Sequence, residues 1–186
     1  MNIELAKELT DLAAHDLSVR EKLAAGGKLA GGYHPEMEEV HRANAKRLRE
    51  VIDEIGFPTL SKVGKEGSDA AWLIIQHSIG EPDFMMACLR MMEENTEDIN
   101  PVHKAYLYDR IMVFQSKPQK YGTQLIPEGI YPVENKERLN EEREKVGLPA
   151  ISADELNKIP QSEDIAQIDN RDPAYNEWRC KVGWIV

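Results

Sequence analysis

The sequence predicts an all-α protein of about six helices, arranged as a bundle or an orthogonal array. Apolar residues recur every three or four positions through most of the chain, which is the period of a helix buried on one face. Prolines, glycines and capping side chains mark the ends of these periodic segments. The pattern changes near residues 118–133, where glycine, proline, threonine and tyrosine at short spacing favour an irregular or hairpin segment.

The first two helices are predicted at residues 2–24 and 35–55. In the first, leucines and other apolar residues fall near one stripe. The glycine-rich segment that follows, AGGKLAGGYHP, breaks the helix and matches no phosphate-binding pattern, so we expect a flexible connector. Pro35 opens the second helix at a position where its missing N–H costs nothing, and Gly56 ends it.

Three further helices are predicted at closer spacing. We expect a loop at residues 57–67, followed by a helix that Ser68 caps. A methionine-rich helix is predicted at residues 82–94, and another at 102–114 with Asn100 as its cap.

The remainder of the chain is more polar. We predict a charged helix at residues 134–146 and a short helix after Ser152, whose side chain suits an N-cap. Residues 1–160 are expected to form a single helical domain. Residues 161–186 are expected to form a C-terminal tail that packs on this domain or on a partner subunit, because its tryptophans suit a homodimer contact.

The charge of the chain argues against two classes of partner. With 33 acidic and 23 basic residues, the 186-residue chain has a formal net charge of −10. No local basic patch offsets this charge, so neither nucleic acid nor an anionic membrane is an expected partner. The longest apolar stretch, AWLII, is too short to span a membrane, and the first residues do not resemble a secretory signal. We therefore expect a cytoplasmic protein without a disulfide scaffold, in which Cys88 is buried and inert.

Three of the predicted helices place a polar or ionisable side chain within an apolar stripe. His77 ends the run AWLIIQHS and shares its face with apolar residues three and four positions earlier. His41 and Asn44 lie on the apolar seam of the second helix, and Asp109 lies on that of the fifth. Burying such groups costs about 1–3 kcal/mol each unless they are hydrogen-bonded. We therefore expect them to meet one another in a polar pocket.

A histidine–aspartate pair is the simplest unit for general acid–base catalysis. The carboxylate fixes the imidazole tautomer and raises its basicity, and the imidazole then moves a proton near neutral pH. In this chain His41 or His77 is the predicted base, and Asp109 is the predicted orienting partner. The predicted ligand-holding amides are Asn44, Gln76 and either Gln115 or Gln124.

A divalent metal ion is an alternative use of the same residues. Two histidines and one carboxylate suit Zn²⁺ or non-haem Fe²⁺, so a metal at His41, His77 and Asp109 stays an option. Glu38 and His41 have the Glu-x-x-His spacing of di-iron bundles, but that design needs two such motifs and the sequence has one. The HExxH motif and paired CxxC motifs do not occur. The sequence by itself favours no cofactor.

The run from Met37 to Leu148 resembles a family of uncharacterised bacterial proteins. The resemblance rests on ordered pieces: VHRAN with IDEIGFPTLSKVG, then AAWLIIQHS, AYLYDR, QKYGTQ and REKVGL. It implies a shared pattern of residues and no established activity. The residues of this pattern are His41, Asn44, Gln76, His77, Asp109, Arg110, Gln119, Tyr121, Gly122, Thr123 and Gln124.

The piece QKYGTQ has two interpretations. In the first, Gly122 allows a tight turn that brings Tyr121 and Gln124 over the pocket, and the resemblance adds Gln119 and Arg110 as ligand-binding residues. In the second, the piece is a structural turn whose tyrosine packs and whose amides cap helix ends.

Two functions of different classes are compatible with these features. The first is a small enzyme that uses histidine–aspartate proton transfer on a polar small molecule or peptide, in hydrolysis, cyclisation or a related step. The second is a non-catalytic binding or immunity-type protein, whose inward polar groups only specify the fold. In that case its acidic surface, which includes residues 134–144, would meet a basic partner.

Overall fold

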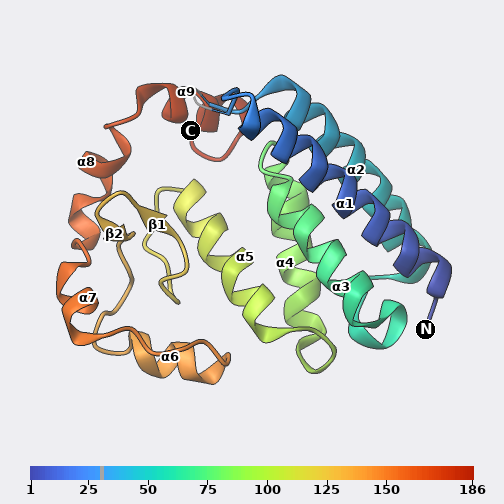
Figure 1. Ribbon diagram of the computed structural model, residues 1–186. Helices are drawn as coiled ribbons and strands as arrows, with labels where there is room; N and C mark the ends of the chain where they lie inside the picture. Colours follow the sequence, from blue (N-terminus) through green and yellow to red (C-terminus); the bar gives the residue numbers. More distant parts are fainter. Residues whose placement is uncertain (30–31) are drawn as a thin grey trace. The chain divides into compact units, whose positions relative to one another are not determined.

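A computed structural model describes residues 1–29 and 32–186 of the chain, which divide into two compact units, Met1–Ile99 and Asn100–Val186. The described residues are mostly helical, with nine α-helices and one small two-stranded sheet (Figure 1). The predicted count of about six helices is too low, because the polar C-terminal segment contains short helices that were not expected. The predicted boundary at residue 160 falls within the second unit.

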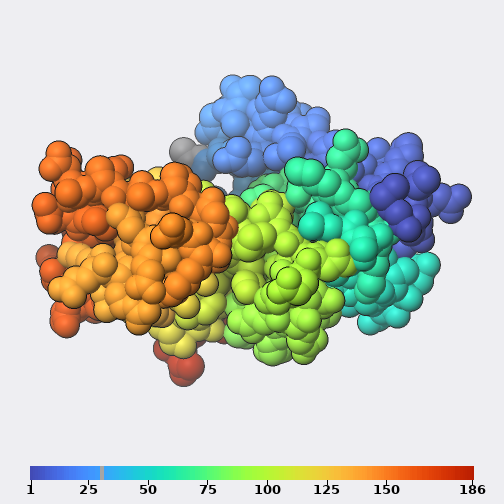
Figure 2. Space-filling view, turned by 90° about the horizontal axis from the view of Figure 1, so that it is seen from below, coloured from blue at the N-terminus to red at the C-terminus, as the bar shows by residue number. Residues whose placement is uncertain are grey.

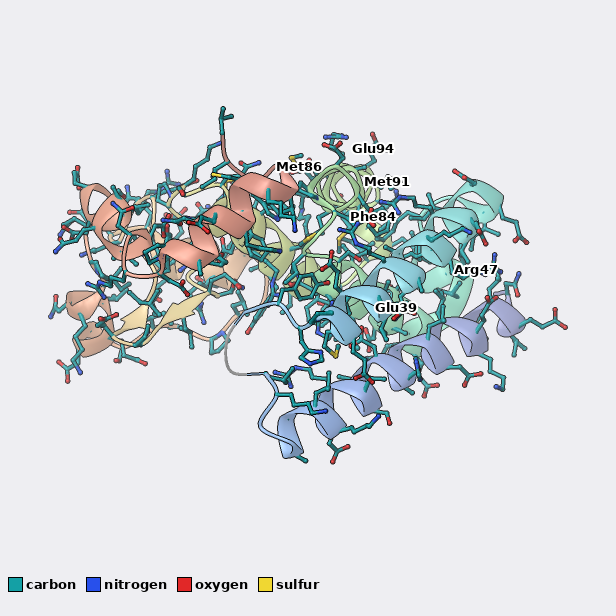
Figure 3. All side chains as sticks on the ribbon, turned by 90° about the horizontal axis from the view of Figure 1, so that it is seen from above. Glu39, Arg47, Phe84, Met86, Met91 and Glu94 are labelled. Atoms are coloured by element: carbon teal, nitrogen blue, oxygen red, sulfur yellow. The ribbon has the colours of Figure 1, made fainter. Side chains whose placement is uncertain are left out.

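The first unit contains four α-helices. They are α1 (Ile3–Ala25), α2 (Pro35–Ile55), α3 (Leu60–His77) and α4 (Pro82–Glu94), followed by a 3₁₀ turn (Thr96–Asp98). Helix α1 packs against both α2 and α3. Arg47, labelled on α2 in Figure 3, adds a two-pronged ion pair with Glu8 of α1. The fully buried apolar side chains of this unit include Leu9, Leu23, Leu48, Ile74, Ile75 and Met85.

Helix α3 begins earlier than the sequence predicts. We expected a loop followed by a helix start at Ser68, but α3 begins at Leu60 and Ser68 is buried within it. Gly64 has a φ of 71°, which kinks the first turn against the rest of the helix. A Cβ atom on Gly67 would lie 3.0 Å from the backbone of Ala6 in α1. Gly64 and Gly67, which lie in the predicted loop, therefore permit a kink and a close contact between helices.

Several helix starts agree with the predicted capping residues. Pro35 is the first residue of α2, and the Asn100 side chain accepts a hydrogen bond from the backbone at the start of the fifth helix. Ser152 and Glu155 form a reciprocal capping box at the start of a later helix. The expected connector between α1 and α2 includes residues 30–31, which lie outside the described residues.

The second unit combines short helices with a hairpin. Its elements are α5 (Pro101–Phe114), β1 (Leu125–Ile126), β2 (Gly129–Ile130), α6 (Leu139–Lys145), α7 (Ala153–Lys158), a 3₁₀ turn (Ser162–Asp164), α8 (Ile165–Asp169) and α9 (Pro173–Val182). The strands pair antiparallel, so the segment near residues 118–133, expected to be irregular or a hairpin, contains a short hairpin. Helix α6 is shorter than the predicted helix at 134–146, because the Asn135 side chain accepts hydrogen bonds from two following N–H groups and holds a turn. Residues of this part of the chain form the orange surface in Figure 2.

The C-terminal segment packs on the end of α5 within the second unit. Trp184 is buried, and its ring centroid lies 4.9 Å from that of Phe114. The buried Arg179 guanidinium donates to the Val113 carbonyl at 3.1 Å and pairs with Asp169 at 2.8 Å. Trp184 is therefore engaged within its own chain. None of the described helices is long and apolar enough to cross a membrane.

Candidate functional site

In the first unit, one carboxylate lies between two imidazoles. Asp16 of α1, His41 of α2 and His77 at the end of α3 meet because these three helices pack on one another. Asp16 Oδ1 lies 2.9 Å from His77 Nδ1, and Asp16 Oδ2 lies 3.3 Å from His41 Nε2. The two imidazole centroids are 5.2 Å apart. The structure thus joins the two predicted histidines through Asp16, and we call these three residues the Asp16 cluster.

Asp16 is an ionised and fully buried group. Burial by itself raises the pKa of the Asp16 carboxyl, but the interactions with His41 and His77 outweigh this effect and hold the pKa well below its usual range. Asp16 is therefore a carboxylate at neutral pH. Because a buried carboxylate must be paired, Asp16 holds both imidazoles in place.

Tyr33 contacts the imidazole of His41 through both its hydroxyl and its ring. Its hydroxyl lies 2.7 Å from His41 Nδ1, and the two rings stack with their centroids 5.6 Å apart. Burial raises the pKa of the Tyr33 phenol well above its usual range, so the hydroxyl stays protonated and can either donate or accept. On the other side of the imidazole, His41 Nε2 and Asp16 Oδ2 are buried, and neither has a well-aligned hydrogen bond to a described residue.

His77 is the most accessible member of the Asp16 cluster. Its side chain is 20% exposed, against 9% for His41 and 1% for Asp16. Asp16 holds Nδ1 of His77, which leaves Nε2 for a ligand or for water. The apolar run of α3 therefore ends in a histidine that contacts a buried acid and reaches solvent.

The sequence analysis did not single out Asp16, although its helix face carries the signal. Leu9, Ala13 and Leu23 are buried on α1, and their spacings of seven, three and seven positions from Asp16 place all four residues on one face. An acidic residue in a helix is usually exposed, so its residue type hides the signal that its face carries. The same face analysis that found His41 could have found Asp16.

The two predicted amides of the first unit are buried. Asn44 is 3% exposed and donates through Nδ2 to the Leu12 carbonyl of α1 at 3.5 Å. Gln76 is also 3% exposed and lies within α3. Their burial confirms the predicted helix faces, while ligand binding by either amide stays a prediction.

Asp109 lies in the second unit, where its carboxylate organises a loop. Its oxygens accept hydrogen bonds from the backbone N–H groups of Lys120, Tyr121 and Thr123, at 2.8, 3.0 and 3.0 Å. The Thr123 hydroxyl donates a further bond at 3.0 Å. Burial raises the pKa of the Asp109 carboxyl, and these bonds oppose the rise. The carboxylate partner of both imidazoles is Asp16, whereas Asp109 is occupied by this loop.

The buried side chains of Gln119 and Arg143 hold the QKYGTQ loop through hydrogen bonds to its backbone. Gln119, which is fully buried, donates through Nε2 to the carbonyls of Gln124 and Tyr131 at 2.9 and 2.8 Å. Its Oε1 accepts from the Gln124 N–H at 2.8 Å. Arg143 donates to the Tyr121 carbonyl at 2.6 Å. These contacts agree with the interpretation of the piece as a structural turn.

Three other predicted ligand-binding residues of the second unit, Arg110, Tyr121 and Gln124, are partly buried. Burial lowers the pKa of the Arg110 guanidinium. The Tyr121 ring packs edge-on against Tyr108, with centroids 6.0 Å apart. Gln124 donates through Nε2 to the Thr123 hydroxyl at 3.1 Å. Ligand binding by these three residues stays a prediction.

A family of unknown function, DUF6624, has a model that matches residues 3–162. The chain belongs to this family. The match confirms the resemblance to an uncharacterised family and extends over the Asp16 cluster and the QKYGTQ loop of this DUF6624 protein. No curated protein and no solved structure is similar to the chain at a significant level. The function of this DUF6624 protein must therefore be argued from the chemistry of its site.

The donor atoms of the Asp16 cluster also have the spacing of a metal-ligand set. One atom from each of Asp16, His41 and His77 can be chosen so that all three lie within 4.8 Å of one another. Two imidazole nitrogens and a carboxylate oxygen are donors that Zn²⁺ and Fe²⁺ accept. The arrangement can thus act as an acid–base unit or as a metal site.

Proposed function

We propose that this DUF6624 protein is a hydrolase-like enzyme that uses the Asp16 cluster for acid–base chemistry on a polar small molecule or peptide. The observation that carries the proposal is a single buried carboxylate placed against two imidazoles, one of which reaches solvent. Such a group is costly for folding alone, because an apolar contact of similar volume is as stable or more stable than a buried ion pair. Buried carboxylate–imidazole units are typical of proton-transfer sites.

Each member of the cluster has its own role in this proposal. Asp16 binds Nδ1 of His77, which fixes the tautomer and orientation of the ring and leaves Nε2 for the reaction. His77 accepts a proton from water while the water oxygen attacks the substrate, and it returns that proton to the leaving group. His41, buried between Tyr33 and Asp16, keeps the carboxylate in position.

Water is the proposed nucleophile because two nearby alternatives in sequence are engaged or inert. The hydroxyl of Ser78, which follows His77, donates to the Ile74 carbonyl at 2.7 Å. Cys88 is fully buried, and burial raises the pKa of its thiol to about 12. A thiol that stays protonated is a poor nucleophile. Hydrolysis is therefore the reaction class that these residues support best.

The test of the proposal is a screen of the full chain against chromogenic esters, amides and phosphate esters. For a substrate that the wild type cleaves, Asp16→Asn and His77→Gln should each lower kcat/KM by about 10²–10⁴, the usual contribution of general acid–base catalysis. His15→Gln is the matched control, because His15 adjoins Asp16 in the sequence but is exposed. Unchanged cleavage by both folded variants would show that the proposal is wrong.

A non-catalytic binding or immunity-type protein is the second candidate. The closed contacts of Asp109 and Gln119 favour it, because they account for much of the family pattern as structure. Around α6, however, Glu141 and Glu142 each pair with Lys145 at 2.8 Å, which reduces the negative charge available to a basic partner. A basic protein partner that binds the wild type and Asp16→Asn equally well would favour this candidate.

A further inference from the structure

We propose that Asp16, His41 and His77 bind one divalent transition-metal ion of the Zn²⁺ class. The donors are Nε2 of His41, Nδ1 of His77 and a carboxylate oxygen of Asp16, contributed by three different helices. Two imidazoles and one carboxylate are the three protein ligands of several catalytic zinc and non-haem iron sites. The inference concerns the site of the proposed function, but its geometry stands independently of any activity.

The donor atoms are already close to the spacing that such an ion requires. In a tetrahedral zinc site the ligand atoms lie about 2.0–2.1 Å from the metal, which places neighbouring ligands roughly 3.3 Å apart. His41 Nε2 lies 3.3 Å from Asp16 Oδ2, and His77 Nδ1 lies 2.9 Å from Asp16 Oδ1. These two distances are close to the spacing of neighbouring ligands, and one donor atom from each of the three residues can be chosen within 4.8 Å of the other two.

Two of the donor atoms, which lie 3.3 Å apart, have no well-aligned hydrogen bond within the described part of the chain. His41 Nε2 and Asp16 Oδ2 are both buried, and neither has a well-aligned hydrogen bond to a described residue. Buried polar atoms without such a bond are uncommon in folded proteins and call for an explanation. An ion between the two atoms would satisfy both at once.

Tyr33 supplies the outer contact that a ligating histidine requires. A histidine that binds a metal through one ring nitrogen normally gives the N–H of the other nitrogen to a fixed partner. The Tyr33 oxygen lies 2.7 Å from His41 Nδ1 and can accept that N–H. Because the Tyr33 hydroxyl can also donate, it supports the opposite tautomer when no ion is bound.

Three protein ligands leave a coordination position for water or substrate, as in catalytic zinc sites. His77 is the partly exposed ligand, so this position is expected on its side of the cluster. A bound ion lowers the pKa of its water, so in the metal-bound form the ion, and not His77, would activate water. The inference thus rests on the site of the proposed function and names a cofactor class for it.

The test is a calorimetric titration of the metal-stripped full chain with Zn²⁺, combined with metal analysis of the dialysed protein. We expect the wild type to bind one equivalent. Asp16→Asn and His77→Gln should weaken binding by at least about 100-fold, since loss of an outer contact alone costs 10–100-fold. The matched controls are His15→Gln and Asp11→Asn, which remove an exposed histidine and an exposed carboxylate from α1 and should bind like the wild type.

The outcomes separate this inference from the proposed function. If the wild type binds no stoichiometric Zn²⁺, or if both cluster variants bind it as tightly as the wild type, the metal inference is wrong. Hydrolysis by the metal-free protein would in that case still support the proposed function. If the ion binds at the cluster but no form of the protein cleaves the panel, the proposed function fails while the metal inference stands. Circular dichroism of each variant checks its fold, and His77→Gln, at the most exposed position, is the variant least prone to misfold.

Discussion

Asp16 Oδ1 and His77 Nδ1 lie 2.9 Å apart although 61 positions separate these residues in the sequence. The contact joins the middle of α1 to the last residue of α3. It explains why the apolar run of α3 ends in a histidine: the imidazole is the partner of a carboxylate that is buried on the opposite helix. The properties of this pair can be measured directly.

Replacing His77 by leucine should destabilise the protein by about 1–3 kcal/mol, because the buried Asp16 carboxylate loses a hydrogen-bond partner. Replacing Asp16 and His77 together by leucine should recover only part of this loss, since this pair is then apolar but His41 loses its carboxylate partner. Urea unfolding of the wild type, both single variants and the double variant measures the coupling, provided that the slope of the transition stays constant. A His77→Leu variant more stable than the wild type would contradict this account of the pair.

Stability in acid should depend on Asp16. The pKa of its carboxyl is lowered in the folded state, so this group stabilises the fold above its unfolded pKa, near 3.8. That contribution is lost as the pH falls below this value. Urea midpoints between pH 7 and pH 3, measured with a chelator present, should fall more steeply for the wild type than for Asp16→Asn. Asp11→Asn, at an exposed position of α1, should leave the wild-type slope almost unchanged.

Tyr33→Phe should weaken Zn²⁺ binding by about 10–100-fold, because His41 loses the outer contact to its Nδ1. The free energy of unfolding should change by only about 1 kcal/mol, the usual net contribution of one hydrogen bond. Calorimetric titration and urea unfolding of the same preparation separate the two effects. Tyr108→Phe, which removes a hydroxyl that contacts Glu134 in the second unit, is the control and should leave zinc affinity unchanged.

Asp109→Asn should destabilise the protein by at least about 2 kcal/mol, because a carboxylate that accepts three backbone N–H groups becomes an amide with only one acceptor oxygen. Zinc affinity measured under folding conditions should stay the same, because the Asp109 carboxylate accepts hydrogen bonds from the QKYGTQ loop and is not a proposed metal ligand. Thermal unfolding measures the first effect and calorimetric titration the second. Glu137→Gln, an exposed charge change in the same unit, is the control. A stable Asp109→Asn variant that had lost zinc binding would contradict this assignment and would indicate that Asp109 contributes to metal binding.

The two cysteines should differ in reactivity. Cys88 is fully buried and burial raises the pKa of its thiol to about 12, whereas Cys180 is exposed. In the folded protein an aromatic disulfide reagent should therefore modify one thiol rapidly and the other only as the chain unfolds. Cys180→Ser should abolish the rapid phase. Rapid modification of two thiols in the native protein would contradict the burial of Cys88.

The sequence determined most of the local structure and the inward faces of the helices. Helix starts at Pro35, Asn100 and Ser152 were readable because capping and proline preferences act within a few residues. The burial of His41 and Asn44 was readable because a helix repeats every 3.6 residues, so that neighbouring apolar positions reveal the face. The kink at Gly64 was not readable, because glycine marks a loop and a kinked helix in the same way.

Only the tertiary structure decided which carboxylate meets the two imidazoles. The sequence predicts that the buried polar groups meet one another, with Asp109 as the carboxylate partner of His41 or His77. In the structure Asp16 meets both imidazoles, and Asp109 binds the QKYGTQ loop. Helical periodicity tells which side of a helix is buried, but the partner of each buried group depends on how helices far apart in the chain cross and pack. The crossing of helices is not a local property of the sequence, so the pairing of Asp16 with both imidazoles is decided only by the packing of α1, α2 and α3.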